Sequence, residues 1–159
     1  MKNYCWMIIA LIITFNAQAN QSFSKQITVD RKGTGDFTSL QEAINTVRAF
    51  DPAGGTVILV KNGVYHEKIM IPDWICNLKI LGESRENTLI TYNDHAKIND
   101  MGTFRTYTMQ IRGNDIQLEN LTIENAAEPL AQAVALHTEG DRLSFRNCRF
   151  LGNQDTQYL

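Results

Sequence analysis

The feature that most constrains the fold is an internal repeat in the last third of the chain. The segment GNDIQLENLTIEN, which starts at Gly113, aligns with GDRLSFRNCRFLG, which starts at Gly140, at a constant offset of 27 residues. A fixed period of about 20 to 50 residues is typical of solenoids. The aligned pairs match in character, and they are Ile116/Leu143, Leu118/Phe145, Asn120/Asn147, Leu121/Cys148, Ile123/Phe150 and, upstream, Met109/Leu136.

The repeated unit has the pattern of short strands joined by turns. Its apolar residues alternate with polar ones, and no helical spacing runs through it. Stacked asparagines can hydrogen-bond along a solenoid axis and also adopt the left-handed backbone that sharp corners need. The sequence therefore predicts an all-β fold, a single-stranded parallel β-helix. A β-sandwich is the competing fold, but it predicts no fixed register between segments.

One helix is expected near the start of the folded region. In TSLQEAINTVRAF, Ser39 precedes Glu42 by three residues, which is the spacing of a capping box, and turn residues follow at 51–55. Solenoids need caps at their ends, and this helix is suited to the N-terminal end of the stack. No second cap follows the last repeat, so we expect the sequence to be the N-terminal portion of a longer, C-terminally truncated solenoid.

The first nineteen residues have the pattern of a secretory signal peptide. Lys2 gives a positive start, MIIALIITF at 7–15 is apolar, and Ala17-Gln18-Ala19 is a typical cleavage site. An N-terminal anchor or a buried helix is the alternative. We therefore predict a signal peptide at residues 1–19, one β-helix domain at residues 20–159, and a secreted or periplasmic protein that is not held in a membrane.

Charge and cysteine content argue against nucleic-acid, metal and cofactor binding. The net charge is -2, so there is no basic surface that would favour nucleic acid. Cys76 and Cys148 lie among apolar neighbours, which favours free thiols, although an exported protein could pair them. No cysteine or histidine spacing indicates a metal site, and we expect no cofactor.

Several motifs together resemble the pectinesterase (pectin methylesterase) family. They are GTGDFTSLQEAI, KNGVYHEKIMI, ILGES, GTFRTYTMQIRG, LTIENAA and QAVALHTEGDRLSFRNCRFLGNQDTQY, in that order. The resemblance runs from Ile27 to Tyr158 and is bacterial in style. It implies a right-handed parallel β-helix and a secreted carboxylic-ester hydrolase. Its substrate would be methyl-esterified polygalacturonate (pectin), and it would act as a monomer.

The resemblance also implies roles for four residues. Asp155 of the QDT motif matches the family's proton donor, while Gln154 and Gln132 match the glutamines of the oxyanion hole. Thr103 and Gln132 match residues that contact the substrate. The family's nucleophilic aspartate, and an arginine and a tryptophan that bind substrate, have no counterpart in this chain. We therefore expect these 159 residues alone to be inactive.

Ester hydrolysis requires a nucleophile, a proton donor and groups that bind the oxyanion. No G-x-S-x-G motif is present, so carboxylates would have to do the work. We expect Asp155 to be buried between coils, where burial and a second carboxylate would keep it neutral. Gln132 and Gln154 are 22 residues apart, about one coil, and are expected on one face. Without the resemblance, turn formation would be the usual role of a lone aspartate.

Three functional classes remain open from the sequence. The first is part of an active esterase, and the second is a non-catalytic β-helix that binds pectin. The third is a lyase that cleaves pectin by β-elimination, which would require clustered carboxylates to bind calcium. Methanol release from methylated pectin separates the first class from the second.

Overall fold

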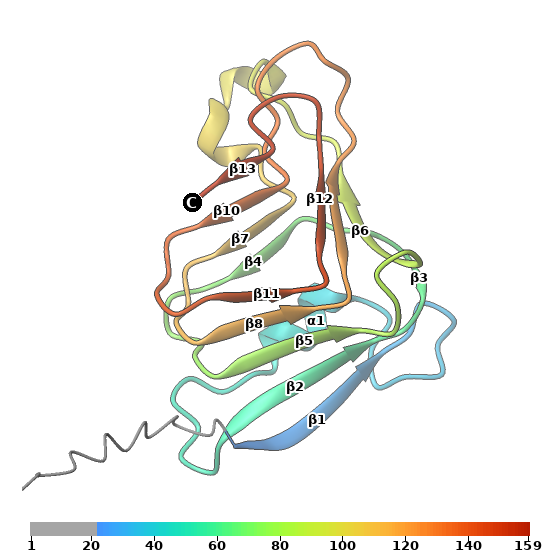
Figure 1. Cartoon of the computed structure of the whole chain (residues 1–159), viewed down its shortest axis with the longest axis vertical. Helices are drawn as coiled ribbons and strands as arrows, with labels where there is room; N and C mark the ends of the chain where they lie inside the picture. Colours follow the sequence, from blue (N-terminus) through green and yellow to red (C-terminus); the bar gives the residue numbers. More distant parts are fainter. Residues whose placement is uncertain (1–21) are drawn as a thin grey trace, which may run out of the picture.

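The computed structural model describes residues 22–159, so the expected signal peptide lies outside the described residues. Three sheets, in which every pairing is parallel, form the framework of this region (Figure 1). Sheet A contains β1 (Phe23–Val29), β2 (Gly55–Val60), β5 (Leu78–Gly82), β8 (Ile116–Glu119) and β11 (Ser144–Arg146). Sheet B contains β3 (Gly63–His66), β6 (Thr88–Tyr92), β9 (Thr122–Asn125) and β12 (Arg149–Leu151). Sheet C contains β4 (Ile69–Ile71), β7 (Met109–Ile111), β10 (Leu136–Thr138) and β13 (Gln157–Tyr158).

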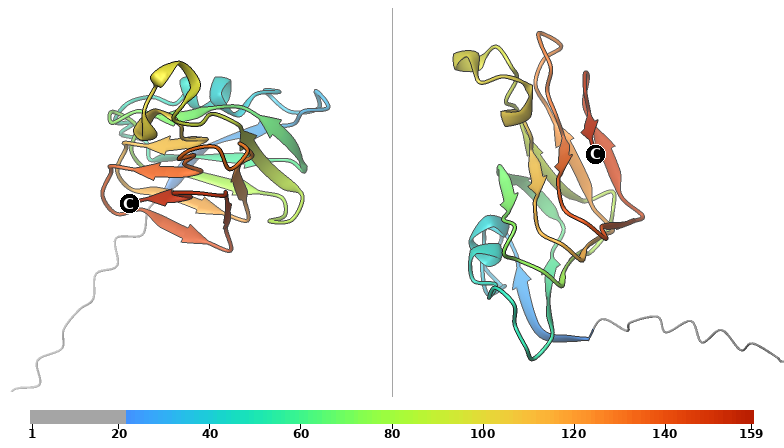
Figure 2. Two further views of the ribbon diagram at one scale, coloured as in Figure 1. Left: turned by 90° about the horizontal axis from the view of Figure 1, so that it is seen from above. Right: turned by 90° about the vertical axis from the view of Figure 1, so that its left-hand side faces the viewer.

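Successive strands visit the three sheets in turn, which makes each group of three strands one coil. The coils are β2-β3-β4, β5-β6-β7, β8-β9-β10 and β11-β12-β13, and Figure 2 shows them stacked. Connections between parallel strands of this kind are right-handed in nearly all proteins. The predicted right-handed parallel β-helix is confirmed.

The predicted register is also confirmed. Leu118 pairs with Phe145, Ile123 with Phe150, and Met109 with Leu136, in three different sheets. The 27-residue offset in the sequence is therefore the length of one coil.

The core consists of columns of apolar side chains that run along the stack. In sheet A one column joins Ile27, Ile58, Ile80, Leu118 and Phe145, each paired with the next. The first four of these side chains are at most 4% exposed. Since every coil places an apolar residue at the same level, the columns bury one continuous core.

The corners between strands need unusual backbone conformations. Asn120 and Asn147 both have positive φ, at 55° and 49°. At another corner the coils approach so closely that a Cβ on Gly140 would lie 2.0 Å from the carbonyl oxygen of Gly113. These requirements explain why asparagine and glycine repeat in the sequence.

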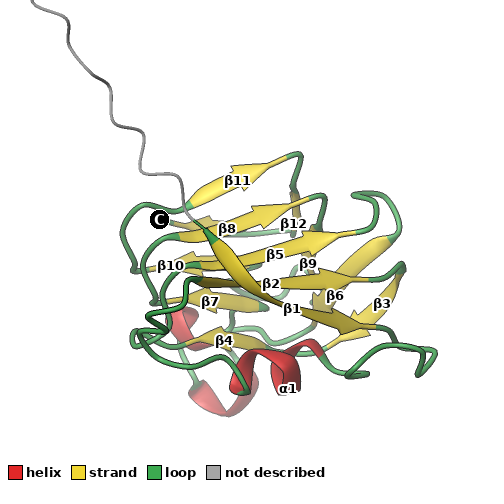
Figure 3. Ribbon diagram, turned by 90° about the horizontal axis from the view of Figure 1, so that it is seen from below, coloured by secondary structure: helices red, strands yellow, loops and turns green. Residues whose placement is uncertain are grey.

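The expected helix is α1 (Leu40–Asn45), with Ser39 as its N-cap. Ser39 Oγ accepts a hydrogen bond from the backbone N–H of Glu42 at 3.2 Å. The return bond of a capping box is replaced by Glu67, whose carboxylate accepts bonds from Ser39 Oγ and from the N–H groups of Leu40 and Gln41. Figure 3 shows α1 beside β4 and β1, at the first-coil end of the stack, where a cap was expected.

The segment after β6 differs from the expectation of strands and loops alone. It contains two short 3₁₀ helices, η1 (Ile98–Asp100) and η2 (Thr103–Arg105), before β7 begins. We call residues 93–108 the long connection. Figure 2 shows that its helical turns project beyond the strands, and this projection builds one wall of the candidate site.

Candidate active site

Three connections between sheet B and sheet C lie side by side on one flank of the β-helix. They are the long connection, residues 126–135 and residues 152–156 (Figure 1). Backbone hydrogen bonds join them, from Ala96 N to Gln132 O at 2.9 Å and from Ala133 N to Gln154 O at 3.1 Å. Residues that are far apart in the sequence are therefore held on one surface.

A hollow of about 550 Å³ opens on this flank. The long connection supplies one wall, and the residues around β13 supply the other. The residues that line it are Gly102, Thr103, Phe104, Val134, Asp155, Gln157 and Tyr158. Two of the predicted site residues, Thr103 and Asp155, therefore meet at one hollow.

Asp155 lies in the last coil of the described residues, so its expected burial between two coils stays a prediction. Its side chain is exposed in this coil, and its backbone has a φ of 55°. Among the described residues, no group donates a hydrogen bond to its carboxylate. An aspartate at a turn usually bonds a nearby N–H group, so this free carboxylate is available to a ligand in the hollow.

The two predicted glutamines flank the hollow without lining it. Gln132 is half-buried and Gln154 is exposed. The strand register pairs Leu136 with Gln157, an offset of 21 residues, so Gln132 and Gln154 sit one position apart on neighbouring coils. Their backbones lie close together through the bond from Ala133 N to Gln154 O.

An aromatic cluster forms the exposed side of the hollow. The rings of Phe104 and Tyr158 meet edge to face at 5.0 Å, and both also contact the ring of His137, at 5.9 and 5.1 Å. His137 is 5% exposed, whereas Phe104 and Tyr158 are 56% and 49% exposed. Exposed aromatic rings beside a carboxylate suit a ligand with both polar and apolar faces, such as a sugar.

Sequence reasoning did not assign Phe104, Val134 or Gln157 to the site. Phe104 directly follows Thr103, and Gln157 and Tyr158 follow the QDT motif, so proximity to the predicted residues was the available signal. Val134 carried no chemical signal, because its side chain contributes only shape.

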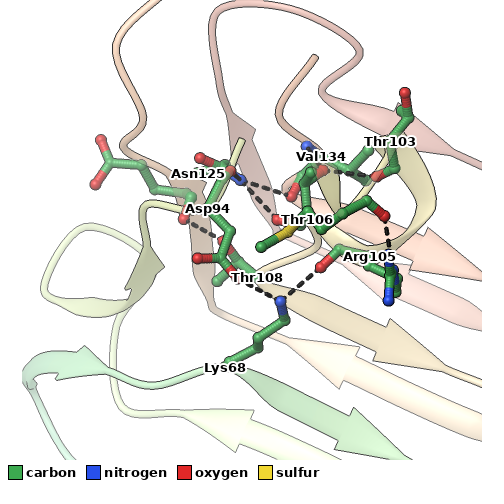
Figure 4. Close-up of polar contacts among 10 residues, drawn as sticks. Lys68, Asp94, Thr103, Arg105, Thr106, Thr108, Asn125 and Val134 are labelled. Atoms are coloured by element: carbon green, nitrogen blue, oxygen red, sulfur yellow. Dashed lines mark hydrogen bonds and ion pairs between the residues drawn. The ribbon is translucent and has the colours of Figure 1, made fainter. Parts of the chain in front are cut away.

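A buried amide supports the walls of the hollow from beneath (Figure 4). Asn125 is 1% exposed, and its Nδ2 donates to the carbonyl oxygens of Asp94 and Thr106 at 2.9 Å and of Val134 at 3.1 Å. Thr106 Oγ1 accepts from Val134 N at 3.0 Å and donates to Thr103 O at 2.7 Å. Thr103 and Val134, which both line the hollow, therefore belong to one hydrogen-bond network.

Other chemistry is limited in the described part of the chain. Within residues 22–159, no three His, Cys, Asp or Glu side chains lie close enough together to hold a metal ion. Cys76 and Cys148 are free thiols, and burial raises the pKa of the Cys148 thiol. No helix in this range is both long enough and apolar enough to span a membrane.

Comparison with known proteins decides the family. The pectinesterase family model matches residues 26–159. The chain belongs to the pectinesterase family. Pectinesterase 31 of Arabidopsis thaliana is 36% identical over 149 residues, covering 86% of this chain and 46% of the relative. A pectinesterase of Petunia integrifolia is 36% identical over 136 residues, covering 83% of this chain and 35% of the relative.

Solved pectin methylesterases share the fold. The carrot enzyme matches with a TM-score of 0.80 and 30% identity, over 84% of this chain and 41% of its own. A pectin methylesterase in complex with a hexasaccharide matches with a TM-score of 0.76 and 30% identity, over 86% and 46%. PemA from Erwinia chrysanthemi matches with a TM-score of 0.74 and 29% identity, over 86% and 45%.

Two consequences follow for this pectinesterase. The chain spans less than half the length of the relatives and solved structures named above. The expected bacterial style finds no support, because the curated relatives named here are plant proteins.

Proposed function

We propose that the full-length protein is a secreted pectin methylesterase, which hydrolyses the methyl esters of polygalacturonate to methanol and free carboxylates. The observation that carries the proposal is the free carboxylate of Asp155 in a hollow shared with Thr103 and two exposed aromatic rings. Membership of the pectinesterase family supports it.

The proposed mechanism uses two carboxylates. An ionised carboxylate attacks the ester carbonyl carbon, and Asp155 in its protonated form donates its proton to the departing methoxide, which leaves as methanol. Asp155 then accepts a proton from water, which attacks the acyl-enzyme, releases the product carboxylate and regenerates the nucleophile. The amide groups of Gln132 and Gln154 donate hydrogen bonds to the oxyanion in both steps.

The hollow itself provides only one of the two carboxylates. Asp155 is the sole acidic residue among those that line it in the described range. The chain spans 46% of Pectinesterase 31, and we place the nucleophile in a part of the protein outside the present 159 residues. The proposal therefore includes the inactivity of these residues alone.

The proposed substrate fits the shape and chemistry of the hollow. Phe104 and Tyr158 offer ring edges and faces against which the apolar C–H groups of a galacturonate ring can pack, and Thr103 offers a hydroxyl for its polar groups. One solved relative is a complex with a hexasaccharide. Export through the signal peptide at residues 1–19, with residues 20–159 forming part of a monomeric β-helix, places the protein where pectin occurs.

The test is methanol release from methylated pectin by the full-length protein. We expect Asp155→Asn to lower kcat by a factor of about 10² to 10⁴, the usual contribution of a positioned acid-base group. The matched control is Asp141→Asn, which changes an exposed aspartate outside the hollow and should leave kcat unchanged. An Asp155→Asn variant with undiminished kcat would refute the assigned role.

The same assay separates the remaining alternatives. A full-length protein that binds polygalacturonate but releases no methanol would be a pectin-binding β-helix rather than an esterase. Release of unsaturated oligosaccharides would identify a lyase. Turnover by the isolated 159-residue chain would contradict the placement of the nucleophile outside it.

A further inference from the structure

Lys68 lies beneath the long connection and has no role in the proposed catalytic mechanism. It lies between β3 and β4, and its Nζ donates hydrogen bonds to Asp94 Oδ2 and to the carbonyl oxygen of Arg105 (Figure 4). The ammonium group also lies 4.8 Å from the ring centroid of Tyr107 and 5.8 Å from that of Tyr92. One cation therefore contacts four residues of the following coil.

These contacts suit the chemistry of an ammonium group. Of its three N–H donors, two meet oxygen acceptors, and the positive group also lies over two aromatic rings. The side chains of Lys68 and Asp94 are only 28% and 18% exposed, so water screens the pair less than it screens a surface ion pair. Burial raises the pKa of the Tyr107 phenol above its ordinary value.

The two residues that accept hydrogen bonds from Lys68 lie near opposite ends of the long connection. Asp94 stands near its start, and Arg105 is the last residue of η2. The other two residues of η2 are Thr103 and Phe104, both of which line the hollow. Lys68 does not line the hollow, so any effect it has on a ligand must pass through this wall.

We propose that Lys68 is a positioning residue that fixes the Thr103–Phe104 wall against which the sugar ring binds. The proposal deepens the function proposed above and rests on it. Fixing the wall before the substrate arrives lowers the cost of ordering it on binding. The wall contacts the sugar ring and not the ester carbon, so the loss of Lys68 affects KM and leaves kcat almost unchanged.

The test compares Lys68→Met with the wild-type full-length protein. We expect KM for methylated oligogalacturonate to rise about tenfold, kcat to change less than about twofold, and amide hydrogen exchange to accelerate in residues 93–107 alone. Lys79→Met is the matched control, because Lys79 forms a similarly buried ion pair with Glu119, at 2.7 Å, in sheet A. It should leave KM and exchange in residues 93–107 unchanged.

Lys68→Arg provides a second arm, since arginine keeps the positive charge and can still pair with Asp94 and lie over the tyrosine rings. We expect it to bring KM back to within about threefold of wild type. Equal effects of Lys68→Met and Lys79→Met on KM, or faster exchange throughout the protein, would overturn the proposal.

The test also separates this inference from the proposed function. An active wild-type protein whose KM is insensitive to Lys68→Met leaves the esterase proposal intact and removes the positioning role. A wild-type protein that releases no methanol removes the esterase proposal. In that case the exchange of residues 93–107 and the dissociation constant of an oligogalacturonate still decide the role of Lys68.

Discussion

Asn147 Nδ2 donates a hydrogen bond to Oδ1 of Asn120, directly below it on the preceding coil, at 2.7 Å. Both residues adopt the left-handed backbone conformation, with φ of 49° and 55°. Each asparagine therefore forms a sharp corner through its backbone, and the amide side chains link the two coils. The contribution of Asn120 to stability has these two parts, one from the backbone and one from the amide.

Substitutions at Asn120 separate these two parts. We expect Asn120→Ala to lower the free energy of unfolding by about 2 kcal/mol, because alanine loses the hydrogen bond and is strained at positive φ. Asn120→Gly should cost about half as much, since glycine adopts this φ freely. The measurement is urea unfolding of each variant.

The control for Asn120 is Asn114→Ala. Asn114 Oδ1 accepts a bond from Asp141 N at 2.7 Å across the same two coils, but Asn114 has no positive φ. Asn114→Ala should therefore lower the free energy of unfolding by about as much as Asn120→Gly does. Equal destabilisation by Asn120→Ala and Asn114→Ala would show that the left-handed corner contributes nothing.

The carboxylate of Glu67 connects the capping helix to the first coil. Glu67→Gln removes its charge and one of the oxygens that accept bonds from Ser39, Leu40 and Gln41. We expect the free energy of unfolding to fall by about 1.5–3 kcal/mol, the range for hydrogen bonds to a charged acceptor. Glu42→Gln changes an exposed residue of the same helix and should have little effect. Thermal melts of both variants and of wild type measure the difference.

The fold was predictable because one pair of coils keeps a constant length. Between β8 and β11 and between β9 and β12 the offset is 27 residues throughout. Elsewhere the repeat is hidden, since Thr56 pairs with Leu78 and Leu78 with Ile116, offsets of 22 and 38 residues. The long connection accounts for the largest offset, and a fixed-period search cannot detect coils of unequal length.

The site was less predictable than the fold. The family resemblance placed Thr103 and Asp155, which the structure brings to one hollow. The expected burial of Asp155 between two coils stays a prediction, because Asp155 lies in the last coil that the structure describes. The polar network around Asn125 was not predictable from the sequence, since the acceptors of this amide are backbone carbonyls of Asp94, Thr106 and Val134.

Asn125→Asp tests that network. A carboxylate facing three carbonyl oxygens, at a position only 1% exposed, should cost at least about 3 kcal/mol at pH 7. The introduced group should have a raised pKa in the folded state, so its penalty should shrink as the pH falls toward 4 and the aspartate becomes neutral. The measurement is the difference in free energy of unfolding from wild type across this range.

Asn153→Asp is the control for this prediction. Asn153 is exposed, and its Nδ2 donates a single bond to Ala127 O at 2.9 Å. Water can solvate the new charge there, so the cost should be small and nearly independent of pH. A similar penalty at both positions would argue against a special role for the buried amide.

Acid should weaken the stack through Asp115. Arg142 on the next coil donates two hydrogen bonds to this carboxylate, at 2.6 and 2.7 Å, and the bonds hold the pKa of Asp115 below its ordinary value. A lowered folded-state pKa stabilises the fold above the unfolded pKa of about 3.9 and ceases to do so as the pH falls through the folded-state value. The stability difference between wild type and Arg142→Gln should therefore be constant from pH 5 to 7 and vanish in stronger acid. It should also shrink at high salt, because Arg142 is 65% exposed.

Gln132 offers the sharpest test of how the flanking connections take part in catalysis. If its amide binds the oxyanion, Gln132→Ala should lower kcat by a factor of about 10² to 10³ with little change in KM, because the bond forms fully only in the transition state. Gln157, which lines the hollow but has no assigned chemical role, is the matched control. Gln157→Ala should change KM more than kcat, since only ground-state contacts with the sugar are lost. A larger loss of kcat from Gln157→Ala than from Gln132→Ala, measured by methanol release from the full-length protein, would transfer the oxyanion role to the glutamine of β13.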